Sequence, residues 1–170
     1  MLAVLSWYDL LYLGDHYKRW LVYFLALVDH LTLPELEDML GRFNLSPKQA
    51  LAISKGKEAA EQALLALFRS GTPARPQIYH FLAPLDTEFI LYMMAKSRHE
   101  GTRKAISLYF THLKNLKPEL KGRDLVALGY QPGPLIKEML DRLLEARLNE
   151  KVKSRREERD FIRRAFGPPL

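Results

Sequence analysis

The chain contains no cysteine, which excludes disulfides, thiolate metal sites and thiol nucleophiles. No apolar run reaches the roughly 18 to 20 residues that a membrane-spanning helix needs, and no lipidation motif is present. Asp9 and Asp15 interrupt the apolar N-terminus, and no positively charged leader precedes it, so we interpret this stretch as a helix of the fold and not as a signal peptide. We therefore expect a cytoplasmic protein without a membrane partner.

Alternating apolar and polar residues, which are typical of strands, are scarce, whereas apolar residues recur at helical spacing throughout. With 170 residues, of which 48% are hydrophobic, the chain is long enough to bury roughly 70% of its unfolded surface. The sequence predicts an all-α fold with a multi-helical body and a small helical tail. We expect helices over residues 2–13, 16–31, 33–41, 47–69, 76–82, 87–98 and 102–116, a short helix that starts at 122–124, and two further helices after Pro134 and Ser154.

Local signals support these helix boundaries. A Ser or Thr followed three residues later by Glu or Gln forms a capping box, in which each side chain binds a free backbone N–H group. Three such pairs predict helix starts: Thr32 with Glu35, Ser46 with Gln49, and Ser154 with Glu157. Glycine tolerates the left-handed backbone that ends many helices, which predicts helix ends at Gly14, Gly41, Gly71, Gly129 and Gly167.

The pattern changes after Pro118 to a string of turn residues, from Leu120 to Pro134, followed by an amphipathic helix. We expect Asp124 to cap or favour the start of the short helix, and Pro134 to open the next one. This change in pattern predicts two domains, a helical body over 1–117 and a helical tail over 118–170.

Positive charge is concentrated in one part of the sequence. The chain has 26 Lys and Arg against 20 Asp and Glu, a net charge of +6. Residues 1–95 hold 8 basic and 10 acidic residues, whereas residues 96–123 hold 8 basic and 2 acidic ones. Clustered cations attract polyanions, so this band indicates a face for nucleic acid, although a solvated helix surface explains such a run equally well.

Aromatic residues gather in the first two predicted helices, at spacings of three or four residues. We interpret them as core packing or as a contact with a neighbouring domain. Base stacking is less favoured here because the local charge is not positive. The residues are Trp7, Tyr8, Tyr12, Tyr17, Trp20, Tyr23 and Phe24.

The sequence lacks the residue patterns of common catalytic sites. Phosphoryl transfer needs carboxylates that converge on Mg²⁺, and no Gly-Ser element followed by an Asp-x-Asp pair occurs. Asp29-His30 has the reverse order of a phosphohydrolase dyad, and the five histidines lack metal-ligand spacing. No Gly-rich phosphate loop is present. We expect neither a catalytic residue nor a metal site in this chain.

The tail motif resembles the C-terminal region of bacterial class II tRNA nucleotidyltransferases, the family of CCA-adding and A-adding enzymes that also includes poly(A) polymerase. That family has a G-x-D-L-x-x-x-G-x-x-P-G-P element, an amphipathic helix, a basic link and a helix that begins S/T-x-E-E. The matching residues here are Gly122, Asp124, Leu125, Gly129, Pro132, Gly133, Pro134, Leu140, Ala146, Leu148, Val152, Ser154, Glu157 and Glu158. More loosely, the Leu-rich first half, with Trp7, Trp20 and the stretch 39–45, looks like the family's helical body.

The sequence departs from the family pattern at two points. A glycine often ends the amphipathic helix near position 150, where this chain has Asn149 and Glu150, and we expect Asn149 to take the left-handed turn. The family's catalytic head and neck domains have no counterpart in these residues. The resemblance therefore implies a tRNA-binding part that is not an enzyme on its own, whose partners are tRNA or other structured RNA and the N-terminal head and neck domains. Mg²⁺ and ATP or CTP are expected only in that head domain.

The resemblance implies a grip on the RNA backbone, because the major groove of A-form RNA is too narrow for side-chain readout. Further phosphate contacts are expected from free N–H groups at the start of the helix after Pro134, at Leu135 and Ile136. The alternative is a helical protein–protein interaction module without RNA binding, and a third interpretation is an enzyme in its own right. The predicted RNA-binding residues are Arg98, Arg103, Lys104, Lys114, Lys117, Lys121, Arg123, Leu135, Ile136, Arg155, Arg156 and Arg159.

Overall fold

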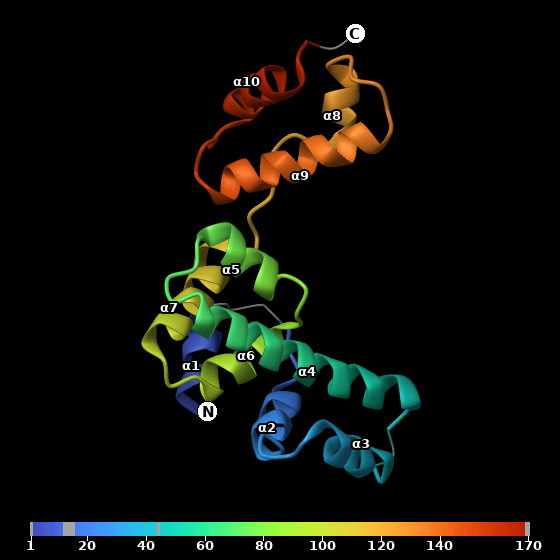
Figure 1. Cartoon of the computed structure of the whole chain (residues 1–170), viewed down its shortest axis with the longest axis vertical. Helices are drawn as coiled ribbons and strands as arrows, with labels where there is room; N and C mark the ends of the chain where they lie inside the picture. The colour runs from blue at the N-terminus through green and yellow to red at the C-terminus, as the bar shows by residue number, and fades with distance from the viewer. Residues whose placement is uncertain (1, 12–15, 44, 169–170) are drawn as a thin grey trace. The chain divides into compact units, whose positions relative to one another are not determined.

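The structure is a computed structural model that describes residues 2–11, 16–43 and 45–168. Within these residues it contains ten α-helices, one π-helical turn and no strand, which confirms the all-α prediction (Figure 1). The helices are α1 (Leu2–Leu11), α2 (Arg19–Leu27), α3 (Leu33–Gly41), α4 (Pro47–Arg69), α5 (Arg75–Leu82), α6 (Thr87–Lys96), α7 (Glu100–Leu108), α8 (Gly122–Ala127), α9 (Pro134–Leu148) and α10 (Arg155–Phe166). None of these helices is both long enough and apolar enough to cross a membrane.

Contacts within the chain divide it into two compact units. Unit 1 comprises Met1–Pro73 and His80–Tyr109, and unit 2 comprises Ala74–Tyr79 and Phe110–Leu170. The boundary between body and tail at residue 117 stays a prediction.

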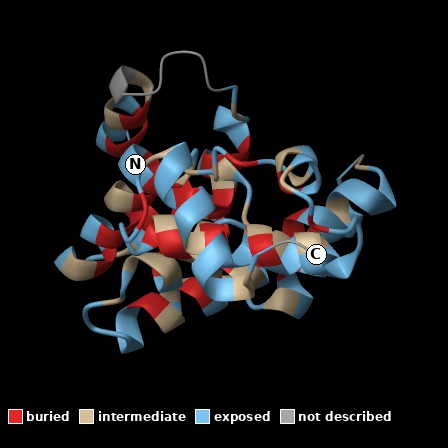
Figure 2. Ribbon diagram, turned by 90° about the horizontal axis from the view of Figure 1, so that it is seen from above, coloured by how far each residue is buried: buried red, intermediate tan, exposed pale blue. Residues whose placement is uncertain are grey.

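In unit 1, α6 packs against α1, α2, α4 and α7, and α3 packs on α4. Leu25, Leu36, Leu67 and Ile90 are at most 1% exposed and form part of the core between these helices. Figure 2 shows the buried residues on the inward faces of the helices and the exposed residues on their outer faces. Gly56 allows α4 to approach α6 closely, because a Cβ atom at this position would lie 2.1 Å from Cζ of Phe89.

The capping boxes of α3 and α4 form as predicted. The Thr32 backbone N–H donates to the Glu35 carboxylate (2.8 Å), and the Ser46 N–H donates to Oε1 of Gln49 (2.9 Å). Both helices have the predicted bounds. The box at Ser154 is only half formed, because Oγ of Ser154 accepts from the Glu157 N–H while the Glu157 carboxylate accepts from Lys153.

Three predicted helices differ from the structure at their ends. The helix predicted over 87–98 ends at Lys96, because Ser97 already has an extended backbone. The helix predicted over 16–31 is wrong at both ends, because α2 begins at Arg19 and ends at Leu27. Just before its start, the Lys18 N–H donates to the Glu88 carboxylate (2.7 Å). The helix predicted over 102–116 starts earlier, where His99 caps α7, and it changes to a π-helical turn over Tyr109–Leu113. The predicted helix end over residues 12–14 lies outside the described residues.

In unit 2, α8, α9 and α10 enclose a small core. Its buried residues come from all three helices and from the segments beside them: Leu120, Leu125, Tyr130, Met139, Leu143 and Ile162. The expectation that Asn149 takes the left-handed turn after α9 is wrong. Asn149 has a φ of −83°, and the next residue, Glu150, has a φ of 58°. The Lys151 N–H then donates to the Ala146 carbonyl (2.8 Å), which closes the helix end.

The aromatic cluster near the N-terminus is only partly in the core. Tyr8 is fully buried, whereas Trp20, Tyr23 and Leu27 on α2 and Phe43 after α3 are 41–73% exposed. The rings of Phe24 and Phe43 meet edge to face, at 6.1 Å between centroids. Core packing is therefore confirmed for Tyr8 and is wrong for Trp20 and Tyr23, for which contact with a neighbouring domain stays a prediction. Tyr12 lies outside the described residues.

Candidate nucleic-acid interface

The segment that leads into α8 and the first turn of α8 carry predicted phosphate-binding residues of unit 2. Lys117 and Lys121 of the segment and Arg123 of the helix are exposed. The Asp124 carboxylate accepts from the Lys121 N–H (2.8 Å) and so caps the start of α8, as the sequence predicted. This hydrogen bond, followed by the nearby charges of Arg155 and Arg123, holds the pKa of Asp124 below its ordinary value. Asp124 is therefore a carboxylate surrounded by an excess of cations.

The start of α10 lies against this segment. The Arg155 guanidinium donates to Asp124 (2.8 Å), and the Arg155 N–H donates to the Glu119 carboxylate (3.1 Å). Arg155 and Arg159 also line, with Leu120, Asp124, Ala127 and Leu128, a small cavity of about 180 Å³. The structure thus brings together two stretches that are thirty residues apart in the sequence. We call Lys121, Arg123, Arg155 and Arg159 the α8–α10 basic face.

A buried carboxylate fixes this arrangement. Glu158 on α10 is completely buried and accepts hydrogen bonds from the Glu119 N–H (3.0 Å), the Leu120 N–H (2.8 Å) and Nε of Arg147. Three donors satisfy a carboxylate that would otherwise be costly to bury. Sequence reasoning identified Glu158 only as a member of the tail motif, because its donors come from distant segments. Its role here is to position the segment that carries Lys121 and Arg123.

The charge of this face is only partly neutralised. Arg155 pairs with Asp124, but no carboxylate within the described residues pairs with Lys121, Arg123 or Arg159. Glu157, Glu158 and Asp160 lie beside these arginines in the sequence, but among the described ion pairs these three acids do not bind Arg155, Arg156 or Arg159. Arg156 is exposed as well. An exposed cationic surface of this kind suits a phosphate backbone.

Two other predicted contacts in unit 2 are altered by local bonding. Lys114 is half-buried, and its Nζ lies 5.6 Å from the centroid of the Phe110 ring. At the start of α9 the Ile136 N–H donates to the Gly133 carbonyl (3.1 Å), so the expectation that this group is free is wrong. Leu135 is 43% exposed at the same helix start.

The remaining predicted residues belong to unit 1. Arg98 lies between α6 and α7, and Arg103 and Lys104 lie on α7. All three are exposed, but Lys104 forms an ion pair with Glu100 (2.7 Å). The twelve predicted residues are therefore divided between the two units, with Arg98, Arg103 and Lys104 in unit 1 and the other nine in unit 2. That all twelve contact RNA stays a prediction.

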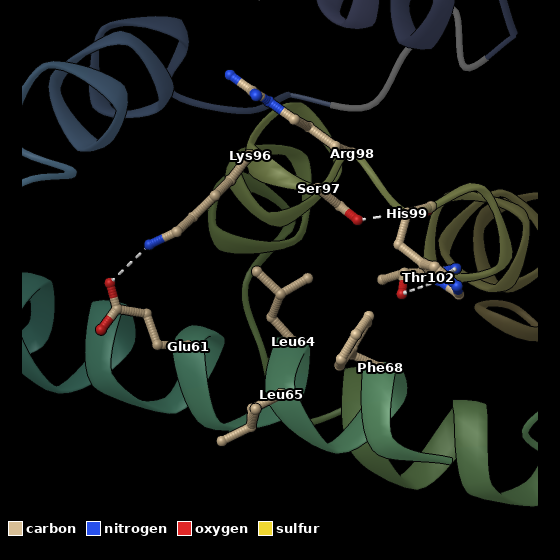
Figure 3. Close-up of a pocket in the computed structure, with 9 residues that line it drawn as sticks. All are labelled: Glu61, Leu64, Leu65, Phe68, Lys96, Ser97, Arg98, His99 and Thr102. Carbon is tan, nitrogen blue, oxygen red and sulfur yellow. Dashed lines mark hydrogen bonds and ion pairs between the residues drawn. The ribbon is translucent and has the colours of Figure 1, made fainter. Parts of the chain in front are cut away.

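Unit 1 also holds a groove that the sequence did not predict (Figure 3). It has a volume of about 570 Å³. Helix α4 supplies Leu64, Leu65 and Phe68, whereas Ser97, Arg98 and His99 come from the connection between α6 and α7. Phe68 is 56% exposed, and the ring of His99 stands nearly perpendicular to it, at 5.2 Å between centroids. His99 is held in place because its Nδ1 accepts from the Thr102 N–H (3.2 Å).

A polar network closes one end of this groove. Lys96 forms ion pairs with Asp29 (2.6 Å) and Glu61 (3.2 Å), and the buried Lys57 pairs with Glu61 (2.7 Å). Partial burial alone would raise the pKa of Asp29 and of Glu61. Asp29 accepts hydrogen bonds from Lys96 and Tyr92, and Glu61 accepts them from Lys57 and Lys96. These bonds outweigh the effect of burial and hold the pKa values of both carboxylates below their ordinary range. Both carboxylates are thus charged partners of lysines within unit 1.

No cluster of His, Asp and Glu within the described residues could hold a metal ion. The two surfaces of interest therefore differ in chemistry. The α8–α10 basic face is charged and solvent-exposed, whereas the groove has apolar walls and an arginine at its rim. Both suit binding of a ligand.

No family model matches the chain, and no solved structure matches it. The chain is 36% identical over 159 residues to the A-adding tRNA nucleotidyltransferase of Geobacter sulfurreducens. The matched residues make up 91% of this chain, which spans only 18% of that relative's length. The similarity extends through both units and confirms the resemblance to part of a tRNA nucleotidyltransferase.

Proposed function

We propose that this chain is the tRNA-binding part of a tRNA nucleotidyltransferase and holds the RNA backbone while a separate head domain adds nucleotides at the 3′ end. The similarity to an A-adding enzyme over 91% of the chain carries this proposal. Mg²⁺ and ATP or CTP then belong to the head domain, and the chain has no nucleotidyltransferase activity by itself. The proposed location is the cytoplasm.

The α8–α10 basic face supports a grip on phosphates. Its side chains are exposed, and Glu158 holds the stretch that leads to Lys121 and Arg123 against α10, which carries Arg155 and Arg159. A rigid surface that binds phosphates without reading bases fits recognition of folded RNA by shape. In this proposal Arg98 and Arg103 of unit 1 contribute further phosphate contacts.

The exposed apolar face of α2 favours a second binding partner. Trp20, Tyr23 and Leu27 lie on one side of a short helix and are 41–73% exposed. Exposed apolar patches are typical of protein contacts. We assign this face to the head and neck domains of the parent protein, and it is also what a protein-interaction module without RNA binding would use.

The salt dependence of tRNA binding separates these functions. Fluorescence anisotropy with labelled tRNA should give a log–log slope of affinity against salt of about −3.5 to −4.5, which corresponds to about five phosphate contacts. The K121E/R123E variant should bind tRNA more weakly and with a shallower slope. The matched control is K48E/K55E, which makes the same charge change at two exposed lysines of α4.

A flat salt profile, or equal losses in the two variants, would contradict the RNA-binding proposal and favour the protein-interaction module. Incorporation of nucleotides into tRNA that lacks its 3′ end would contradict the expectation that the chain is inactive alone. Circular dichroism of each variant confirms that the helices are retained.

A further inference from the structure

The groove between α4 and the α6–α7 connection has the size of a small-molecule site. Its volume of about 570 Å³ lies within the roughly 300 to 1,000 Å³ of ligand pockets. Leu64, Leu65 and Phe68 give it an apolar wall, and on the other side lie Ser97 and Thr102, whose hydroxyl groups already bond to His99. A flat aromatic base would fit such a wall better than a phosphate would.

Phe68 is available for stacking. Its side chain is more than half exposed although it lies on the longest helix of the described residues. His99 approaches it nearly at right angles, with an angle of 83° between the ring planes, so the two rings are not stacked on each other. In Figure 3 the Phe68 side chain rises from α4 toward His99 and Thr102. An aromatic ring held in this way is a stacking platform for a base.

The charge at the groove matches a nucleic-acid backbone. Glu61 is paired with Lys57 and Lys96, and Lys96 is paired with Glu61 and Asp29. Among the described residues no carboxylate pairs with Arg98, which is exposed at the rim with its guanidinium directed away from α4 (Figure 3). The positive charge that remains in the lining is therefore that of Arg98. It lies outside the apolar wall, where the phosphate next to a stacked base would lie.

We propose that this groove binds one unpaired nucleotide of the RNA, with its base stacked on Phe68 and an adjoining phosphate bound by Arg98. This inference rests on the proposed RNA-binding function and adds a site that contacts a base. Bases are accessible to proteins mainly where RNA is unpaired, because they can then leave the helix and stack on aromatic side chains. The proposed ligand is thus a bulged or looped nucleotide, not a paired one.

Two RNA hairpins test the proposal, one fully paired and one identical except for a single bulged adenosine. The full chain should bind the bulged hairpin more tightly, and F68A should weaken that binding by about tenfold while it leaves the paired hairpin unaffected. F68Y keeps an aromatic ring and should restore the preference, whereas F68L keeps apolar contact with His99 and should not. R98Q should weaken binding of the bulged hairpin.

The matched control is F43A, which removes a phenylalanine of similar exposure, 52%, near the other end of α4. It should leave both affinities unchanged. A second readout replaces the bulged adenosine with 2-aminopurine, whose fluorescence should rise on binding to the unsubstituted chain, because the base then leaves its neighbouring bases, and should rise less with F68A.

Equal binding of both hairpins, or equal effects of F68A and F43A, overturns the groove site and leaves the proposed function standing. Failure of both hairpins and of tRNA to bind overturns the two proposals together. Loss of binding to both hairpins in F68A, with the helical signal retained, also overturns the site, since a base-stacking residue acts only on the bulged RNA.

Discussion

The guanidinium of Arg147 on α9 donates from its Nε to the buried carboxylate of Glu158 on α10, and from another nitrogen to Glu119 (2.7 Å). Because the same carboxylate also binds the Glu119 and Leu120 N–H groups, one side chain joins two helices and the segment that leads into α8. The position of the α8–α10 basic face therefore depends on a residue that is itself inaccessible to RNA.

Replacement of Glu158 should loosen unit 2. In E158Q one oxygen becomes a donor, which leaves buried N–H groups without acceptors and removes the charge opposite Arg147. We expect a loss of about 3 to 5 kcal/mol, the usual cost of breaking a buried ion pair from one side. Hydrogen exchange of the Leu120 amide should measure it, because that N–H donates directly to Glu158. E157Q is the control, since Glu157 is exposed and its carboxylate accepts, among the described residues, from the Lys153 N–H alone. Equal loss of protection in the two variants would contradict this role.

Acid should weaken unit 1 through Asp29 and Glu61. Both have folded-state pKa values below the ordinary 3.8 and 4.5, so their contribution to stability is present above about pH 4.5. It is lost as the pH falls through the folded-state values, because protonation then removes their pairing with Lys96 and Lys57. Urea unfolding followed by tryptophan fluorescence reports on unit 1, where Trp7 and Trp20 lie. In K96M the stability should depend less on pH below 4.5, whereas K48M should keep the full dependence. An unchanged pH profile in K96M would argue against the network.

Alanine at position 56 should destabilise unit 1 although alanine favours helices. Its Cβ would overlap the buried Phe89 ring, so the ring or one of the helices α4 and α6 must move. Overpacking of this kind costs about 1 to 3 kcal/mol. The control G41A places a methyl group where nothing lies within 4 Å, so it should be neutral or slightly stabilising. The double variant G56A/F89L should recover part of the loss, and its failure to do so would show that the contact with Phe89 is not the cause.

Local signals predicted much of the fold. The bounds of α3 and α4 follow from capping boxes with a proline in the first turn, whose partners lie three residues apart. The start of α2 could not be predicted in this way, since the acceptor of the Lys18 N–H is Glu88, seventy residues later. Glu150 takes the left-handed backbone although Asn149 has the higher preference for it, and it also pairs with Arg75.

The candidate site was predictable only in part. The charge count identified the basic residues, but their pairing with Glu100 and Asp124 depends on the folded chain. The spacing of Leu64 and Phe68 is that of any apolar helix face, and only the structure shows that Phe68 is exposed beside His99. A sequence does not reveal which apolar residues are left uncovered.

The hydrogen bonds to Glu158 also affect when unit 2 can form during synthesis of the chain. Residues 119 and 120 leave the ribosome well before their acceptor at position 158, so their N–H groups must remain hydrated until α10 has emerged. In nascent chains that stop before this residue, the segment that carries Lys121 and Arg123 should lack its hydrogen bonds to Glu158. The capacity to grip a polyanion would then arise late in translation, after unit 1 is complete.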